Sequence, residues 1–157
     1  MSSPYRTREA TTADVAVIVR QRRLMFEEIG NRDAARNDAM DAAVAAQLAE
    51  MIPSGEYRGW LVCTPAGEVV AGAGLSIGRV PGTPRNSSGV YTYLMSMWVE
   101  PPHRRQGLAH HLMRTMVEWS RAQGIVEIKL HASDMGRPIY EGLGFRQTNE
   151  MRLLLEA

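Results

Sequence analysis

The stretch Val99-Glu100-Pro101-Pro102-His103-Arg104-Arg105-Gln106-Gly107-Leu108-Ala109 joins a strand pattern to a helical pattern. Free main-chain N–H groups at the start of a helix attract anions, and the helix dipole adds to this attraction. Gly107 and Ala109 leave room for a phosphate to approach the main chain. Arg104 and Arg105 bring guanidinium groups that suit phosphate oxygens. The stretch predicts a phosphate site, and the alternative is a basic helix start that binds no ligand.

The segments on either side of this stretch predict a strand, a helix and a second strand. Residues 90–99 are rich in aromatic and β-branched side chains, as strands are. Beyond Gly107 a row of side chains shares one helical face: Leu108, Leu112, Thr115, Met116 and Trp119. Residues 125–131 then alternate between apolar and polar. This succession predicts a right-handed crossover between two parallel strands.

The rest of the chain adds strands and helices to this unit. We expect further strands over residues 4–9, 60–63, 68–77 and 145–155. We expect helices from Thr11 or Thr12 to Gly30, from Met40 to Met51 and over 136–141. Residues 78–89 are expected to form an exposed loop. Pro53 and Gly55 are expected to end the second of these helices. Hairpins before the parallel crossover predict a mixed sheet, and the pattern indicates one α/β domain over residues 1–157.

The composition narrows the classes of function. The 18 basic and 17 acidic residues give a formal net charge of +1, which argues against a broad nucleic-acid surface. Residues 1–8 are polar, and no apolar run approaches the roughly 20 residues that span a bilayer. We therefore expect no membrane partner and a cytoplasmic protein. Cys63 is the only cysteine and is interpreted as a buried core residue, and the four histidines are spaced wrongly for a metal site.

Two motifs resemble those of the GCN5-related N-acetyltransferases, the GNAT family. Arg104-x-x-Gly107-x-Ala109 is similar to the family's pyrophosphate-binding signature and follows a strand pattern that ends in Val-x-Pro. Tyr140-Glu141-Gly142-Leu143-Gly144-Phe145 is similar to the second motif, Tyr-x-x-x-Gly-Phe. The resemblance implies a mixed central sheet of six or seven strands with about four helices. It also implies that residues 90–99 splay from the parallel strand over 125–131.

The resemblance further implies acetyl-CoA as the cosubstrate. The diphosphate would lie on main-chain N–H groups after Arg104, and the pantetheine arm would pair with the strand that ends at Val99. Ser133, which would contact the pantetheine, stands where the family usually carries asparagine. The residues expected to bind acetyl-CoA are Met97, Trp98, Val99, Arg104, Arg105, Gln106, Gly107, Leu108, Ala109, His110 and Ser133.

Direct transfer of the acetyl group to an amine needs an acid and a base. By resemblance, Tyr140 protonates the leaving thiolate, since a phenol of pKa about 10 can give its proton to the thiolate of a thiol of pKa about 8.5 with a modest penalty. The alternative for Tyr140 is a core aromatic. For the base, His131 is a candidate by its ordinary pKa, and Tyr93 is a candidate to organise a water chain. Glu27 and Glu28 are candidates because the end of the first helix borders the family's acceptor site, although a solvated helix end is the commoner explanation for such residues.

The acceptor itself is not readable from the sequence beyond a small-molecule or peptide amine. Arg20, Arg22 and Arg23 are most simply a solvated helix face, but Arg22 lies within the apolar stripe. The alternative hypothesis is that Arg22 reaches the acceptor cleft and selects an acid-bearing substrate. Gly72-Ala73-Gly74 has no helix after it, so it is interpreted as small residues that allow close packing, not as a dinucleotide site. A homodimer is implied by the resemblance. The rival hypotheses are a non-catalytic acyl-CoA sensor and a domain that binds another nucleotide.

Overall fold

The computed structural model describes residues 3–155 and shows one mixed sheet with helices on both faces. The strands run in the order β1 (Arg6–Glu9), β2 (Tyr57–Cys63), β3 (Val69–Arg79), β4 (Val90–Val99) and β5 (Ile128–Leu130). The helices are α1 (Val15–Glu28), α2 (Ala34–Ser54), α3 (Leu108–Ala122) and α4 (Arg137–Gly142), with short 3-10 helices η1 (Thr12–Asp14) and η2 (Pro101–His103). All neighbouring strands are antiparallel except β4 and β5, which are parallel.

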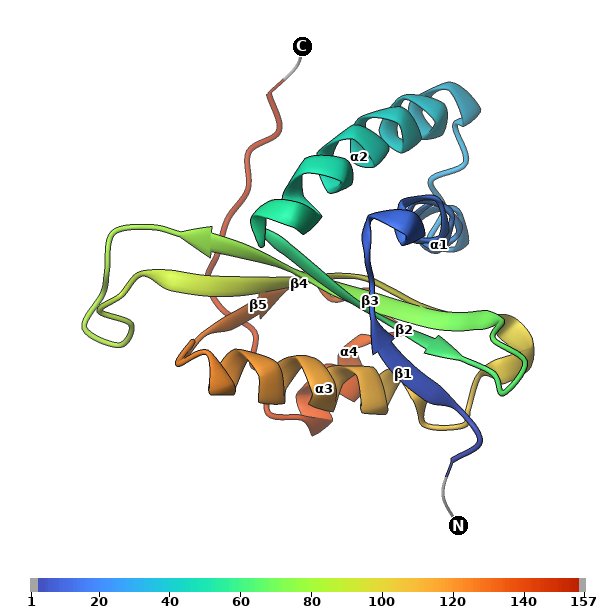
Figure 1. Ribbon diagram of the computed structural model, residues 1–157. Helices are drawn as coiled ribbons and strands as arrows, with labels where there is room; N and C mark the ends of the chain where they lie inside the picture. The colour runs from blue at the N-terminus through green and yellow to red at the C-terminus, as the bar shows by residue number, and fades with distance from the viewer. Residues whose placement is uncertain (1–2, 156–157) are drawn as a thin grey trace.

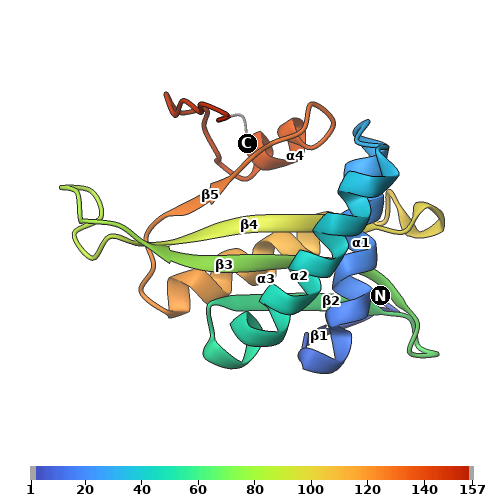
Figure 2. The same ribbon diagram turned by 90° about the horizontal axis from the view of Figure 1, so that it is seen from above.

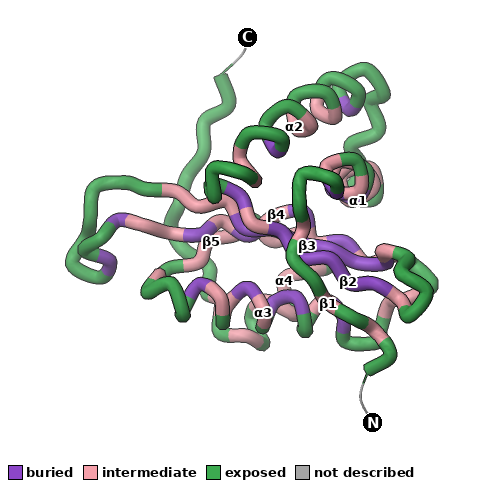
Figure 3. The backbone as a smooth tube through the Cα atoms, in the orientation of Figure 1, coloured by how far each residue is buried: buried purple, intermediate pink, exposed green. Residues whose placement is uncertain are grey.

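The sheet separates two layers of helices. Helices α1 and α2 cover one face and α3 covers the other (Figure 1). The apolar stripe of α3 gives the largest buried cluster, where Leu112, Met113 and Met116 pack on strand residues such as Val70 and Leu94. Burial is therefore concentrated in the central strands and the inner side of α3 (Figure 3). Burying these side chains supplies most of the free energy that holds the two layers together.

The expected fold class is confirmed, but the expected number of strands is wrong. Within residues 3–155 the sheet has five strands, not six or seven. Residues 145–155 were expected to form the last strand, and in the structure they pair with none; they run out past β5 on the far side from β1 (Figure 1). A strand forms only where an edge offers hydrogen bonds, and this segment does not meet the edge of β5 in its own chain.

Local signals decide where the helices begin and end. The side chain of Thr11 accepts from the N–H of Ala13, and Asp14 completes a capping box before α1. Asp33 caps α2 by accepting from the N–H of Arg36, so this helix begins well before the expected Met40. Pro53 lies inside the last turn of α2 and does not end it as expected. Gly55 ends it instead, in a left-handed conformation with φ of 81°.

Two glycines of β3 make room for one side chain of α1 and one of β2. A Cβ at Gly72 would overlap the amide of Gln21, and a Cβ at Gly74 would overlap the phenol of Tyr57. Both Gln21 and Tyr57 are buried, and this burial raises the pKa of Tyr57 to about 12. The interpretation of this triplet as close packing is confirmed, and Cys63 is buried as expected.

Strand β4 carries the feature that positions the site. Opposite Ala73 of β3, β4 places two residues, Ser96 and Met97, and Ser96 adopts a left-handed φ of 58°. This bulge increases the local twist of the strand and re-aims its side chains. Strand β5 pairs with β4 only from Thr92 to Leu94 and then diverges (Figure 2). The edge of β4 beyond Leu94 therefore has no strand partner on the β5 side among the described residues, which is the splay that was expected.

Candidate active site

The loop between β4 and α3 presents a row of free main-chain donors. From Arg105 to His110, no N–H group finds a protein acceptor within residues 3–155. Arg105 and Gly107 both have left-handed backbones, with φ of 62° and 78°. A Cβ at Gly107 would meet no neighbouring atom, so the backbone angle and not the space is what requires glycine there. Leu108, 5% exposed, anchors the start of α3 in the core. This mouth of α3 has the donors and the dipole that bind an anion.

Strand β1 and the residue before it brace this loop and the first turn of α3 through contacts that sequence reasoning missed. The hydroxyl of Tyr5 donates to Oε1 of Gln106 at 2.9 Å and lies 2.8 Å from Nδ1 of His103. Thr7 Oγ1 is hydrogen-bonded to Nε2 of His111 at 2.7 Å. Gln106 was expected to bind the cosubstrate, and the structure uses its side chain to fix the loop. These pairs are about a hundred residues apart, so no local pattern signals them.

Arg104 is held in place on three sides. Its Nε donates to the carbonyl of Val99 at 2.9 Å, Nη1 donates to Glu28 at 2.7 Å, and the guanidinium lies 4.9 Å from the ring centre of Trp98. Arg105, by contrast, is exposed. The two arginines of the motif therefore differ: Arg104 joins the end of β4 to α1, and the side chain of Arg105 is in solvent beside the free N–H groups.

The end of β4 faces both layers. Met97 and Val99 pack against the cluster under α3, whereas Trp98 and Ser96 contact side chains of the loop after β4 and of α1. What this segment offers on its outer edge is main chain, since β5 has diverged. An extended chain that carries amides can pair with such an edge as an added strand does.

Tyr140 and Ser133 lie together beyond β5. The ring of Tyr140 packs on the main core cluster and stacks edge-to-face with Phe145, with centroids 6.0 Å apart. Burial raises the pKa of Tyr140. Ser133 Oγ accepts from the N–H of Gly136 at 3.1 Å. A Cβ at Gly136 would lie 3.0 Å from the Tyr140 ring and 3.2 Å from Ser133 Oγ, so this glycine lets the two side chains approach each other.

The candidate bases are spread over different parts of the fold. His131 is exposed and lies one residue beyond β5, and Tyr93 is half-buried in the middle of β4. Glu27 binds Nε of Arg23 at 2.9 Å, and Glu28 binds Arg104. Both carboxylates are therefore neutralised by arginines.

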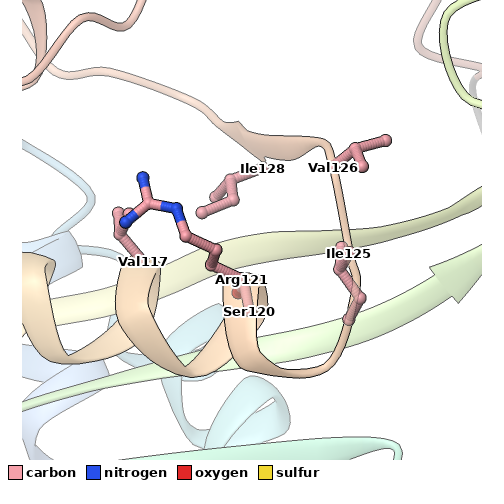
Figure 4. Close-up of a pocket in the computed structure, with 6 residues that line it drawn as sticks. All are labelled: Val117, Ser120, Arg121, Ile125, Val126 and Ile128. Carbon is pink, nitrogen blue, oxygen red and sulfur yellow. The ribbon is translucent and has the colours of Figure 1, made fainter.

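Two shallow hollows flank this region. The first, of about 420 Å³, lies at the end of α1 and is lined by Leu24, Glu27, Glu28 and Arg32. The second, of about 250 Å³, lies between the last turn of α3 and β5, where Val117, Ile125 and Ile128 give it an apolar wall (Figure 4). It is at the opposite end of α3 from Gly107. Among residues 3–155 no cluster of His, Cys, Asp or Glu could hold a metal ion, and no helix is long and apolar enough to cross a bilayer.

Comparisons with known proteins agree with this geometry. Residues 24–145 match the Acetyltransferase (GNAT) family. The chain belongs to this family. Among solved structures, a GCN5-related N-acetyltransferase from Ralstonia eutropha JMP134 superposes with a TM-score of 0.90 and 30% identity, covering 96% of this chain and 98% of that one. A predicted acetyltransferase from Clostridium acetobutylicum, solved with acetyl-CoA, superposes with a TM-score of 0.86 and 25% identity, and 96% of each chain is covered.

Curated GNAT relatives match over shorter segments. Glucosamine 6-phosphate N-acetyltransferase of Trypanosoma brucei brucei is 34% identical over 90 residues, which are 57% of this chain and 59% of that protein. N-acetyltransferase 8B of Rattus norvegicus is 32% identical over 88 residues, which are 54% of this chain and 38% of that protein. The match thus spans less than two thirds of these relatives. Family membership is confirmed, and the neighbour solved with acetyl-CoA agrees with the expected cosubstrate.

The residues present fit acetyl-CoA. The unpaired N–H groups from Arg105 to His110 are the donors that a diphosphate requires, and the exposed guanidinium of Arg105 adds positive charge. The unpartnered edge of β4 up to Val99 suits an amide-bearing arm. When bound, acetyl-CoA supplies a thioester, which is an activated acyl group. These two surfaces meet at the end of β4, so both ends of one long ligand can be held at once.

Proposed function

We propose that this GNAT chain is an N-acetyltransferase that moves the acetyl group of acetyl-CoA directly to the amine of a small molecule or peptide. The observation that carries the proposal is the row of unpaired main-chain N–H groups at the start of α3, beside the open edge of β4. In the reaction a C–N bond forms and a C–S bond breaks. The amine loses one proton, and the leaving sulfur gains one.

We assign binding of the diphosphate to the N–H groups from Arg105 to His110. Gly107 shapes this mouth through its left-handed backbone, and Tyr5 fixes the loop by holding Gln106. Arg104 acts as a positioning residue, because its three contacts join the end of β4 to α1. Main-chain N–H groups of β4 near Met97 orient the acyl carbonyl and stabilise negative charge on its oxygen.

We assign Tyr140 as the acid that protonates the leaving sulfur. Its pKa is raised by burial, so the phenol holds its proton throughout the neutral range. Proton transfer from such a group to a thiolate is uphill at equilibrium and is driven by release of the product. Ser133 lies beside Tyr140 across Gly136, which supports assigning it to contact the same arm of the ligand.

For the base, the free candidates are His131 and Tyr93. An alkyl ammonium has a pKa near 10.4, so fewer than about one amine in a thousand is unprotonated at neutral pH. The exposed imidazole of His131, beyond the end of β5, is suited to pass a proton to solvent. Glu28 is neutralised by Arg104, so we do not assign the base to it.

Release of free thiol from acetyl-CoA tests the proposal. The assay is run with a panel of amines that includes amino acids, polyamines, amino sugars and short peptides. The trypanosome relative is named for an amino sugar phosphate, so glucosamine 6-phosphate belongs in the panel. Amine-dependent thiol release with a matching N-acetyl product supports the enzyme. Tight acetyl-CoA binding without any transfer would favour an acyl-CoA sensor instead.

We also propose a homodimer in which residues 145–155 of one copy pair with β5 of the other. In the single chain Met151, Leu153, Leu154 and Leu155 are each more than three quarters exposed. Strand β5 is the last strand of the described sheet and is flanked by the apolar hollow of Figure 4. Residues 145–155 are apolar and pair with no strand, and β5 has an edge without a strand partner among the described residues. In a two-fold symmetric dimer, this segment of each copy would pair with β5 of the other.

A further inference from the structure

Helix α1 carries three arginines near its middle, and one of them is left without a counter-ion. Arg20 forms an ion pair with Glu100, and Arg23 binds the carboxylates of Glu27, Asp38 and Asp41. Arg22 forms no ion pair with any residue in the described part of the chain. Arg22 is half-buried, and this burial lowers the pKa of its guanidinium. Such a shift is expected when a cation is removed from water and no carboxylate lies beside it to compensate.

The contacts of Arg22 leave part of its hydrogen-bonding capacity unused. Nη1 donates to Ser96 Oγ at 3.0 Å, and the guanidinium lies 5.0 Å from the ring centre of Phe26. Nε is fully enclosed and has no acceptor among residues 3–155. An arginine has five N–H donors in a fork that matches an oxyanion. A half-buried arginine with so few acceptors is costly to the fold unless a ligand completes it.

The position of Arg22 links this unpaired charge to the reaction. Its partner Ser96 is the left-handed residue of the β4 bulge, just beyond Leu94, where β5 ceases to pair with β4. Helix α1 lies over this part of β4 (Figure 2). The cation is therefore beside the strand segment assigned above to the acyl group, on the α1 face and not on the α3 face.

We propose that Arg22 binds an oxyanion of the acceptor, so that the preferred substrate is an amine that also carries a carboxylate or a phosphate close to the amino group. This inference rests on the proposed acetyltransferase function. The carboxylate or phosphate of the ligand is then the counter-ion that Arg22 lacks among the described residues. A neutral amine of the same shape leaves the guanidinium unpaired and binds more weakly. Arg22 thereby determines specificity without touching the acyl donor.

Matched acid and amide ligands test the proposal. Calorimetry with the CoA-saturated protein compares N-acetylglycine with N-acetylglycinamide, and thiol release compares glycine, β-alanine and L-glutamate with their amides. The pair of 2-aminoethyl phosphate and ethanolamine distinguishes a phosphate from a carboxylate preference. In the unmodified protein the better acid of the panel is expected to exceed its neutral partner by at least about tenfold in affinity and in kcat/KM.

Arg22→Gln is expected to erase this ratio while the rate with the neutral amine and the affinity for acetyl-CoA stay within about twofold of the original values. Arg22→Lys should keep part of the preference, because it keeps the charge but loses the fork. Arg20→Gln, on the same helix, is the matched control and should leave the ratio unchanged. If Arg22 only supports the β4 bulge through Ser96, acid and amide rates will fall together, and the proposal is overturned.

If the unmodified protein binds the acid and the amide equally, or binds neither, the proposed oxyanion site at Arg22 is also overturned. In that case acetyl-CoA binding together with thiol release on a neutral amine leaves the acetyltransferase proposal standing. Failure of acetyl-CoA to bind would instead overturn the proposed function itself. The two proposals therefore fail by different measurements.

Discussion

Nη1 of Arg104 lies 2.7 Å from Oε1 of Glu28, so the first arginine of the phosphate motif is bound to the end of α1. Both side chains are about one third exposed, so the pair contributes little to stability. Its importance is electrostatic and local. The carboxylate lies next to the mouth that is assigned to a diphosphate, and it offsets the positive charge of Arg104.

Glu28→Gln is therefore expected to tighten acetyl-CoA binding by roughly two- to fivefold at low ionic strength. The change removes a negative charge near the phosphates, while the bonds of Arg104 to Val99 and Trp98 remain. Calorimetry at low and high salt measures the effect, which should shrink as salt screens it. Glu118→Gln, on the exposed side of α3, is the control. Weaker binding would show that the pair holds Arg104 in a required position.

Gly107→Ala tests the shape of the mouth. The φ of 78° at Gly107 costs a residue with a Cβ about 1–2 kcal/mol, so the loop should shift and acetyl-CoA affinity should fall about tenfold or more. Gly142→Ala is the matched control, since a Cβ there meets no atom and the backbone is not left-handed. Equal affinities for the two variants would contradict the role of Gly107.

Tyr140→Phe tests the proposed acid. The ring and its stacking on Phe145 are kept and only the hydroxyl is removed, so kcat should fall by about 10²–10⁴ with little change in acetyl-CoA affinity. Single-turnover kinetics and calorimetry separate the two quantities. Tyr91→Phe, another half-buried tyrosine, is the control. An unchanged kcat would mean that Tyr140 only packs.

Asp14→Asn tests the start of α1. Hydrogen bonds from Arg8 lower the pKa of Asp14 from 3.8 to about 2. Because the folded-state pKa is depressed, this carboxylate stabilises the protein above about pH 4, and the stabilisation is lost as the pH falls toward 2. The variant should have a lower Tm than the original at neutral pH, and the difference should narrow in acid. Asp38→Asn, at a carboxylate that is mostly exposed, is the control.

Replacing both Leu153 and Leu155 by aspartate tests the proposed dimer. Charges in the exchanged strand should prevent its burial on a second copy, so sedimentation should show monomers where the original protein shows dimers. Val80→Asp, at another exposed apolar position, is the control and should stay dimeric. A monomeric original protein would contradict the exchange.

The sequence predicted the centre of the fold better than its margins. The bounds of β4 and the start of α3 at Leu108 follow from local signals, namely a β-rich run and a basic turn with Gly107. The expected strand over 145–155 has the right pattern, yet pairing depends on an edge that its own chain does not bring to it. Pro53 was misread because proline at the end of a helix can be tolerated when a glycine such as Gly55 closes it.

For the site, the phosphate-binding segment and the neighbourhood of Tyr140 were predicted from the motifs, and their roles stay predictions. The bond of Glu28 to Arg104 was not predicted, since charges 76 residues apart carry no sign of pairing. The sequence pointed to Arg22 through its place in an apolar stripe, but only the structure shows that no acid in residues 3–155 neutralises it.

The contacts of Tyr5 and Thr7 have a practical consequence for handling the protein. Strand β1 is at the margin of the sheet; Thr7 of this strand is hydrogen-bonded to His111, and Tyr5, just before it, is hydrogen-bonded to His103 and Gln106. A purification tag that disturbs the hydrogen bonds of Tyr5 and Thr7 would loosen the loop between β4 and α3. Weak affinity for the cosubstrate in such a preparation would then result from the tag and not from the binding residues themselves.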